Sequence, residues 1–150
     1  MYTEKLLDHF NNPRNVGPME DPDGCATIGD PECGDFLRMY IKVRDMHLAE
    51  ITFQCQGCPF SIASASATTE MAKGKHIHDA ILITPEDVAD YLGGMPEWKL
   101  HCSNLGVAAL WRAMADYLGL LERNDDKFLS RWGSPQSAED TSETKTTEAK

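Results

Sequence analysis

Two stretches near the middle of the chain alternate apolar and polar side chains in the manner of β-strands. Residues 36–43 (FLRMYIKV) and 48–56 (LAEITFQCQ) change character at every second position, which predicts two half-buried strands. The short polar link RDMH between them predicts an antiparallel hairpin. Residues 17–34 are rich in Pro, Gly and Asp and predict a loop, with a brief strand at residues 26–28.

A short amphipathic helix is predicted before these strands. Thr3 is a suitable N-cap for it. Leu6, Leu7 and Phe10 fall on one stripe of this helix, and His9 is expected on its polar side. The sequence NNP that follows is a helix stop.

Three further helices are predicted after the strands. Residues 59–72 (PFSIASASATTEMA) have mostly small and hydroxyl side chains, and Gly74 is a natural C-terminal cap for them. Thr84, followed by a proline and two acids, begins a helix that Gly93 ends. Residues 103–118 repeat apolar side chains every three or four positions. Strands followed by helices predict an α+β fold.

One globular domain is predicted over residues 1–132, with a last turn or two of helix within 120–132. A chain of 150 residues with 41% hydrophobic side chains suits a single core. Residues 133–150 (GSPQSAEDTSETKTTEAK) hold no large apolar side chain, so burial cannot offset the entropy of ordering them. We expect a disordered tail, acidic and rich in hydroxyl groups.

Charge and hydropathy narrow the range of partners and locations. The chain has 24 acidic and 14 basic side chains, a balance that disfavours a nucleic-acid partner. No stretch approaches the roughly 18 apolar residues of a membrane span, and the N-terminus lacks the apolar core of a signal peptide. We therefore expect no membrane contact and a cytoplasmic location. Cytoplasmic thiols are held reduced, so five cysteines indicate metal or redox chemistry.

Three of the cysteines stand at the ends of predicted elements. Cys33 precedes the first long strand, and Asp35 follows two positions later. Cys58 joins the second long strand to the small-residue helix, and Cys102 begins the last helix beside His101. Helix starts favour thiolates, and element ends on a rigid scaffold can present ligands to one point. These five residues predict a metal or redox site.

The remaining cysteines and two histidines have simpler interpretations. Cys25 and Cys55 are expected in the core, because period-two alternation puts Cys55 on the same strand face as Phe53. His76 and His78 have a spacing that could bind metal. They lie in a polar connector, however, where exposure to solvent is expected.

The chain resembles the IscU and NifU N-terminal type of iron–sulfur cluster assembly scaffold. The similar segments are EKLLDHFNNPRNVG, ECGD around Cys33, QGCPFSIASASATTEMAKGK around Cys58 and KLHCSNL around Cys102. They follow the family order from residue 2 to about residue 118. The 44-residue separation of Cys58 from Cys102 fits this type better than its SufU relatives, which carry a longer insert there.

The resemblance implies a small antiparallel three-stranded sheet packed against a helical layer. It also implies a carrier rather than an enzyme, on which a labile 2Fe-2S cluster is assembled from iron and sulfur and then transferred to apo iron–sulfur proteins. A cysteine desulfurase is the implied sulfur donor. The implied ligands and persulfide acceptor fall on the residues already singled out: Cys33, Cys58 and Cys102, with His101 or Asp35 as the fourth ligand and Cys102 as the acceptor. Such a mixed set should hold a cluster less firmly than four thiolates.

Several properties stay open at this point. They are the fourth ligand, 2Fe-2S versus 4Fe-4S nuclearity, the sulfur source, the recipients and the oligomeric state, including a homodimer that shares the cluster. The family's chaperone-recognition segment, Leu-Pro-Pro-Val-Lys, corresponds here to MPEWK, which keeps only Pro96 and Lys99. The resemblance therefore does not support recognition by an Hsp70-type chaperone.

Two other functions compete with the scaffold. The same ligands could bind tetrahedral zinc, in a structural zinc protein or a zinc-binding sulfur-transfer protein. Cys55 and Cys58 form a C-x-x-C at a strand-to-helix junction, as in thiol–disulfide oxidoreductases. The oxidoreductase alternative gives no role to Cys33 or to the pair of His101 and Cys102, and the sequence shows no βαβ unit.

Overall fold

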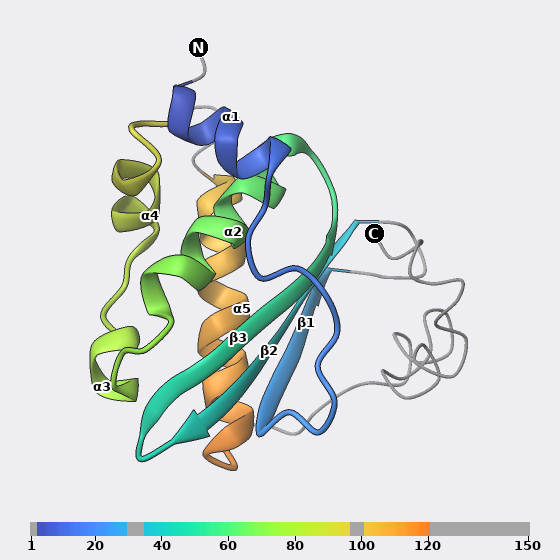
Figure 1. Ribbon diagram of the computed structural model, residues 1–150, viewed down its shortest axis with the longest axis vertical. Coiled ribbons are helices and arrows are strands. Elements are labelled where there is room, and N and C mark those ends of the chain that lie inside the picture. Colours follow the sequence, from blue (N-terminus) through green and yellow to red (C-terminus); the bar gives the residue numbers. More distant parts are fainter. Residues whose placement is uncertain (1–2, 30–34, 97–100, 121–150) are drawn as a thin grey trace.

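A three-stranded antiparallel sheet with helices against one face forms the body of the protein (Figure 1). The computed structural model describes residues 3–29, 35–96 and 101–120, and of His101 only the backbone. The strands lie in the order β1-β2-β3, with bounds β1 Gly24–Gly29, β2 Phe36–Arg44 and β3 His47–Gln56. The helices are α1 Glu4–Asn11, α2 Pro59–Ala72, α3 Ile77–Ala80, α4 Pro85–Tyr91 and α5 His101–Tyr117. The predicted α+β fold is confirmed.

The predicted hairpin joins β2 to β3 through a two-residue turn. Asp45 and Met46 have positive φ angles of 54° and 63°, the geometry of a type I′ turn, whose twist matches that of the flanking strands. The register pairs Met39 with Phe53 and Leu37 with Cys55. Cys55 therefore faces the same side of the sheet as the core residues Met39 and Phe53.

The expectation that β2 is buried on one face only is wrong. Leu37, Met39 and Ile41 face the helices, and Tyr40 on the opposite face is also only 1% exposed. The segment that follows α1 causes this second burial, because it crosses the sheet in front of β2 and β3 (Figure 1). It pairs with the outer edge of β3 through a hydrogen bond from the Gly17 amide to the Phe53 carbonyl.

Helix α1 begins as predicted, since the Thr3 hydroxyl accepts a hydrogen bond from the Leu6 amide at 2.9 Å. The predicted position of His9 is wrong, because its side chain is only 2% exposed. Its Nδ1 lies 2.7 Å from the Ser66 hydroxyl on α2, and its ring meets that of Tyr91 edge-on. Burial lowers the pKa of His9 below its ordinary value.

Helix α2 is buried on nearly all sides, which explains its small side chains. Helix α5 approaches it so closely that a Cβ added to Gly106 would lie 2.6 Å from the Thr68 hydroxyl. The hydroxyls of α2 bond to nearby carbonyls, as in the 2.8 Å bond from Thr68 to Ser64. Small residues thus bring the starts of α2 and α5 close together.

The predictions for the remaining helices are confirmed only in part. Thr84 and Asp87 form the predicted capping box of α4. The short helix α3 was not predicted. On α5, Trp111 is 52% exposed although it belongs to the predicted apolar stripe. The predicted helix within 120–132 and the predicted tail lie outside the described residues.

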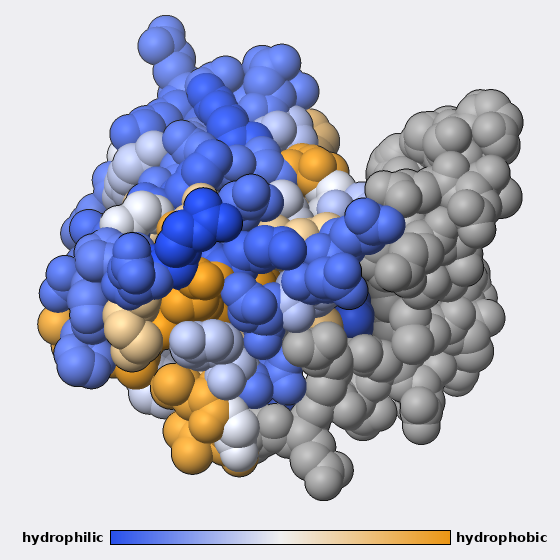
Figure 2. Space-filling model, turned by 60° about the horizontal axis from the view of Figure 1, so that its bottom comes forward, coloured by the Kyte–Doolittle hydropathy of each residue, from blue (hydrophilic) through white to orange (hydrophobic). Residues whose placement is uncertain are grey.

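The surface of the described residues carries apolar side chains in separate places. Figure 2 shows orange patches among mainly hydrophilic residues. The most exposed of the large apolar side chains are Leu82, Trp111 and Leu120. No described helix has both the length and the apolar character to cross a membrane.

Candidate functional site

Cys58 and Cys102, 44 residues apart in sequence, come together in the structure. Their Sγ atoms are 3.8 Å apart. Cys58 is the N-cap of α2, and Cys102 is the second residue of α5. The close packing of these two helices brings together two of the predicted site residues.

Hydrogen bonds around Cys58 stabilise its thiolate. Its Sγ lies 3.4 Å from the Ser61 hydroxyl, one turn into α2. Burial would raise the pKa of Cys58, but hydrogen bonds from the Ser61 hydroxyl and amide, from Cys102 and from the Phe60 amide outweigh it. The pKa of this thiol is therefore lower than usual, as expected at a helix N-terminus.

Cys102 is held more deeply than Cys58. It is 2% exposed, and its backbone carbonyl accepts a hydrogen bond from the Ser64 hydroxyl on α2 at 3.1 Å. The sequence did not reveal the roles of Ser61 and Ser64. The available signal was their position three and six residues after Cys58 in a helix rich in hydroxyl groups.

Cys55 lies near this pair but differs from it chemically. It is half-buried and packs against the core, as predicted. Burial, followed by the negative charges of Cys58, Asp35 and Cys102, raises the pKa of Cys55 to about 12. Asp35 is exposed just before β2, and because Phe36 pairs with Gln56, it lies beside the end of β3 that leads to Cys58.

Two of the predicted site residues are not placed. Cys33 and the side chain of His101 lie outside the described residues. Within the described part of the chain, no three His, Cys, Asp or Glu side chains are arranged to hold a metal ion. The described part of the site therefore consists of Cys58 and Cys102, with Asp35 nearby.

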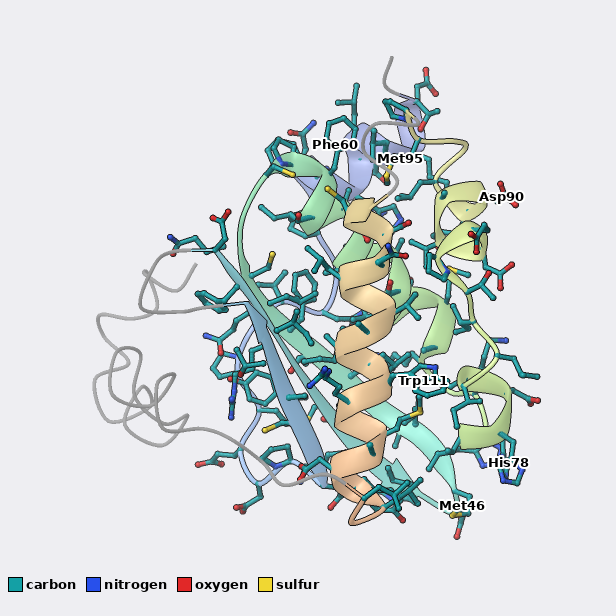
Figure 3. The ribbon with its side chains drawn as sticks, turned by 180° about the vertical axis from the view of Figure 1, so that it is seen from behind. Met46, Phe60, His78, Asp90, Met95 and Trp111 are labelled. Atoms are coloured by element: carbon teal, nitrogen blue, oxygen red, sulfur yellow. The ribbon has the colours of Figure 1, made fainter. Side chains whose placement is uncertain are left out.

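The remaining predicted residues lie elsewhere. Cys25 is 1% exposed, and its Sγ accepts a hydrogen bond from Arg38 on the sheet face that points away from the helices. The rings of His76 and His78 are 4.8 Å apart, and the ring of His47 is 5.1 Å from that of His76. These histidines are far from the cysteines, since Figure 3 shows His78 at one end of α5 and Phe60 at the other.

An apolar cavity of about 130 Å³ lies at the start of α2. It lies between α1 and the start of α2 and is lined by Leu6, Leu7, Phe10, Asn11, Pro59 and Phe60. Two of its lining residues, Pro59 and Phe60, directly follow Cys58 in the chain.

Comparisons with known proteins agree on one family. The model of the NifU-like N terminal domain matches residues 1–124. The chain is 55% identical over 117 residues to the iron-sulfur cluster assembly scaffold protein IscU 1 of Archaeoglobus fulgidus, covering 78% of this chain and 76% of that protein. It is 42% identical over 120 residues to the scaffold protein IscU of Escherichia coli K12, covering 77% and 93% of the two chains.

A solved structure supports the fold. The N-terminal part of a nitrogen-fixing NifU-like protein from Brucella abortus superimposes with a TM-score of 0.66 at 16% identity, over 79% of this chain and 95% of that one. At this identity the likeness concerns the fold alone. It agrees with the three-stranded antiparallel sheet and its helical layer.

Proposed function

The chain belongs to the NifU-like N-terminal domain family, and from this premise we propose that it is a scaffold for iron–sulfur cluster assembly and transfer. The observation that carries the proposal is the 3.8 Å separation of the Cys58 and Cys102 Sγ atoms. Two thiolates bound at about 2.3 Å to one tetrahedral metal ion lie about 3.8 Å apart. The two thiols already have the separation needed to bind the same iron.

The cluster we propose is a 2Fe-2S cluster. Its ligands would be Cys58 and Cys102, together with Cys33 and either His101 or Asp35. Asp35 is supported by its position, because the pairing of Phe36 with Gln56 puts it beside the strand end that leads to Cys58. A carboxylate or imidazole in place of one thiolate weakens the hold on iron, which suits a cluster that has to leave for a recipient protein.

We further propose that sulfur arrives as a persulfide on Cys102 from a cysteine desulfurase. A thiolate at the start of a helix is suited to attack the donor persulfide. Because Cys102 is only 2% exposed, the donor has to dock closely around the thiol pair. Apo iron–sulfur proteins would be the recipients, and cytoplasmic surroundings would keep the thiols reduced.

Anaerobic reconstitution tests the scaffold function. The chain is mixed with ferrous iron and inorganic sulfide, and the visible spectrum is recorded after desalting. We expect a sulfide-to-iron absorption band in the parent and a much weaker one in Cys102→Ser. Cys25→Ser, which removes a thiol on the other face of the sheet, should keep the band. A parent protein that forms no chromophore would rule out the scaffold function.

Zinc binding is a second candidate supported by the same distance, because tetrahedral zinc has the same bond lengths to thiolates. Reconstitution separates the two candidates, since a zinc protein would exclude iron and stay colourless. The oxidoreductase alternative has less support. A pKa of about 12 keeps Cys55 protonated, so it is a poor partner for exchange with Cys58.

A further inference from the structure

We propose that Cys58 reduces a persulfide on Cys102, releasing hydrosulfide and closing a Cys58–Cys102 disulfide. The step rests on the proposed function in one respect, that Cys102 accepts sulfur as a persulfide. It adds a role for Cys58 beyond that of a ligand. It also predicts that sulfur arriving before iron is released as hydrosulfide.

The distance between the thiols determines which sulfur atom is attacked. Cys58 Sγ lies 3.8 Å from Cys102 Sγ, which would be the inner sulfur of a persulfide on Cys102. A disulfide bond is about 2.05 Å long, so the two atoms need to approach by about 1.8 Å. Attack on the outer sulfur would instead require the two Sγ atoms to move apart, because that sulfur would have to lie between them. The geometry therefore favours attack on the inner sulfur.

The surrounding structure keeps the pair together. The Ser64 hydroxyl on α2 holds the Cys102 carbonyl at 3.1 Å. Farther along the helices, Gly106 of α5 packs directly against Thr68 of α2. Within α2, the Ser61 hydroxyl lies 3.4 Å from Cys58 Sγ. Both thiols are thus held at the starts of two tightly packed helices. Closing the disulfide bond between them therefore costs little additional conformational entropy.

The step balances without an outside reductant. An electron pair of the Cys58 thiolate forms the new bond to Cys102 Sγ. The bond between Cys102 Sγ and the outer sulfur breaks, and its electron pair leaves with hydrosulfide, which keeps the persulfide proton. The outer sulfur gains two electrons, and the two cysteine sulfurs together lose two. A dithiol reductant would later return the pair to thiols.

The proposed step makes cluster assembly depend on whether iron or sulfur reaches the site first. Without iron, a persulfide on Cys102 would be short-lived, and the disulfide would remove two ligands. Iron bound to Cys58 would withdraw negative charge from its sulfur and make it a weaker nucleophile, so the attack would slow. The site would therefore retain incoming sulfur productively only when iron is already present.

Persulfide lifetime tests this proposal. The apo protein is loaded with glutathione persulfide in anaerobic, chelator-treated buffer, desalted, and followed by intact mass and by peptide mapping after alkylation. We expect the parent to lose its Cys102 persulfide, gain a disulfide between the Cys58 and Cys102 peptides, and release one sulfide per chain. In Cys58→Ser and Cys58→Ala the Cys102 persulfide should last at least about tenfold longer, because the attacking thiol is absent.

Cys25→Ser is the matched control and should behave as the parent, since this thiol lies on the other sheet face. The proposal is overturned if the Cys102 persulfide lasts equally long in the parent and in both Cys58 variants. It is also overturned if the sulfur is recovered as a persulfide on Cys58 or only on other cysteines. Reconstitution from inorganic sulfide bypasses persulfides, so its outcome reports on the scaffold function separately.

Discussion

Cys55 and Cys58 are three positions apart, and their surroundings shift the pKa values of their thiols in opposite directions. Cys55 ends a strand with its side chain against the core, and burial raises its pKa to about 12. Cys58 precedes a helix, where the Ser61 hydroxyl and nearby amides lower its pKa. The two thiols of the C-x-x-C therefore differ in acidity, with the pKa of Cys55 raised and that of Cys58 lowered. The difference comes from the groups that surround each sulfur, which the sequence motif alone does not describe.

Removing the Ser61 hydroxyl tests the cause of this acidity. In Ser61→Ala the pKa of Cys58 should rise, because a donor that stabilises the thiolate is lost. Alkylation of Cys58 by iodoacetamide at neutral pH should slow several-fold, and the midpoint of its pH profile should move up. Ser64→Ala, which removes a hydroxyl bonded to the Cys102 carbonyl, should leave that midpoint in place. An unchanged midpoint in Ser61→Ala would refute the assignment.

The carboxylate of Asp35 is expected to make the cluster labile. In Asp35→Ala the reconstituted cluster should last several-fold longer in oxygen-free buffer, since the fourth position would be left to the His101 imidazole without a competing carboxylate. The decay of visible absorbance measures this lifetime. Asp90→Ala, which removes an exposed carboxylate on α4, is the control and should decay like the parent. Equal decay of Asp35→Ala and parent would count against a role for Asp35.

At the scale of helices and strands, the molecule depends on the tight packing of α2 against its neighbours. Small residues let α5 approach on one side, and Ser66 accommodates the buried His9 of α1 on another. The starts of α2 and α5, and hence Cys58 and Cys102, are positioned by this packing. Damage to either interface should therefore be measurable as lost stability.

Gly106→Ala tests the contact between α2 and α5. In an exposed helix this substitution stabilises by about 1 kcal/mol. Here the added methyl would lie 2.6 Å from the Thr68 hydroxyl, so we expect a loss of about 1–3 kcal/mol in the free energy of unfolding. Urea denaturation measures the change. The double variant with Thr68→Ala should recover part of the loss, and a more stable Gly106→Ala protein would contradict the close packing.

The buried His9 predicts how stability depends on pH. Its folded-state pKa is lowered by burial, so below about pH 6.5 the unfolded chain binds a proton more readily than the folded chain. The stability that neutral His9 contributes should be lost as the pH falls from that value through the folded-state pKa. Urea denaturation at a series of pH values should show a steeper loss in the parent than in His9→Gln. His78→Gln, at an exposed site, should follow the parent, and parallel curves for His9→Gln and parent would contradict the prediction.

At the scale of the whole molecule, the starts of α2 and α5 meet at one end, opposite the end that carries His78 (Figure 3). The sequence predicted the boundaries of most elements because caps such as Thr84 with Asp87 are local signals. It did not predict the burial of His9, whose partner Ser66 is 57 positions away. Likewise, the places of Cys58 and Cys102 at element ends were read from the sequence, whereas the bond from the Ser64 hydroxyl to the Cys102 carbonyl joins residues 38 positions apart.

Cluster transfer tests the central claim most directly. The chain reconstituted with iron and sulfide is separated from unbound ions and mixed anaerobically with an apo-ferredoxin, and the two proteins are then separated and their visible circular dichroism is recorded. The scaffold function predicts that the cluster signal leaves this chain and appears on the ferredoxin. A signal that stays on this chain, while the ferredoxin remains apo, would contradict it.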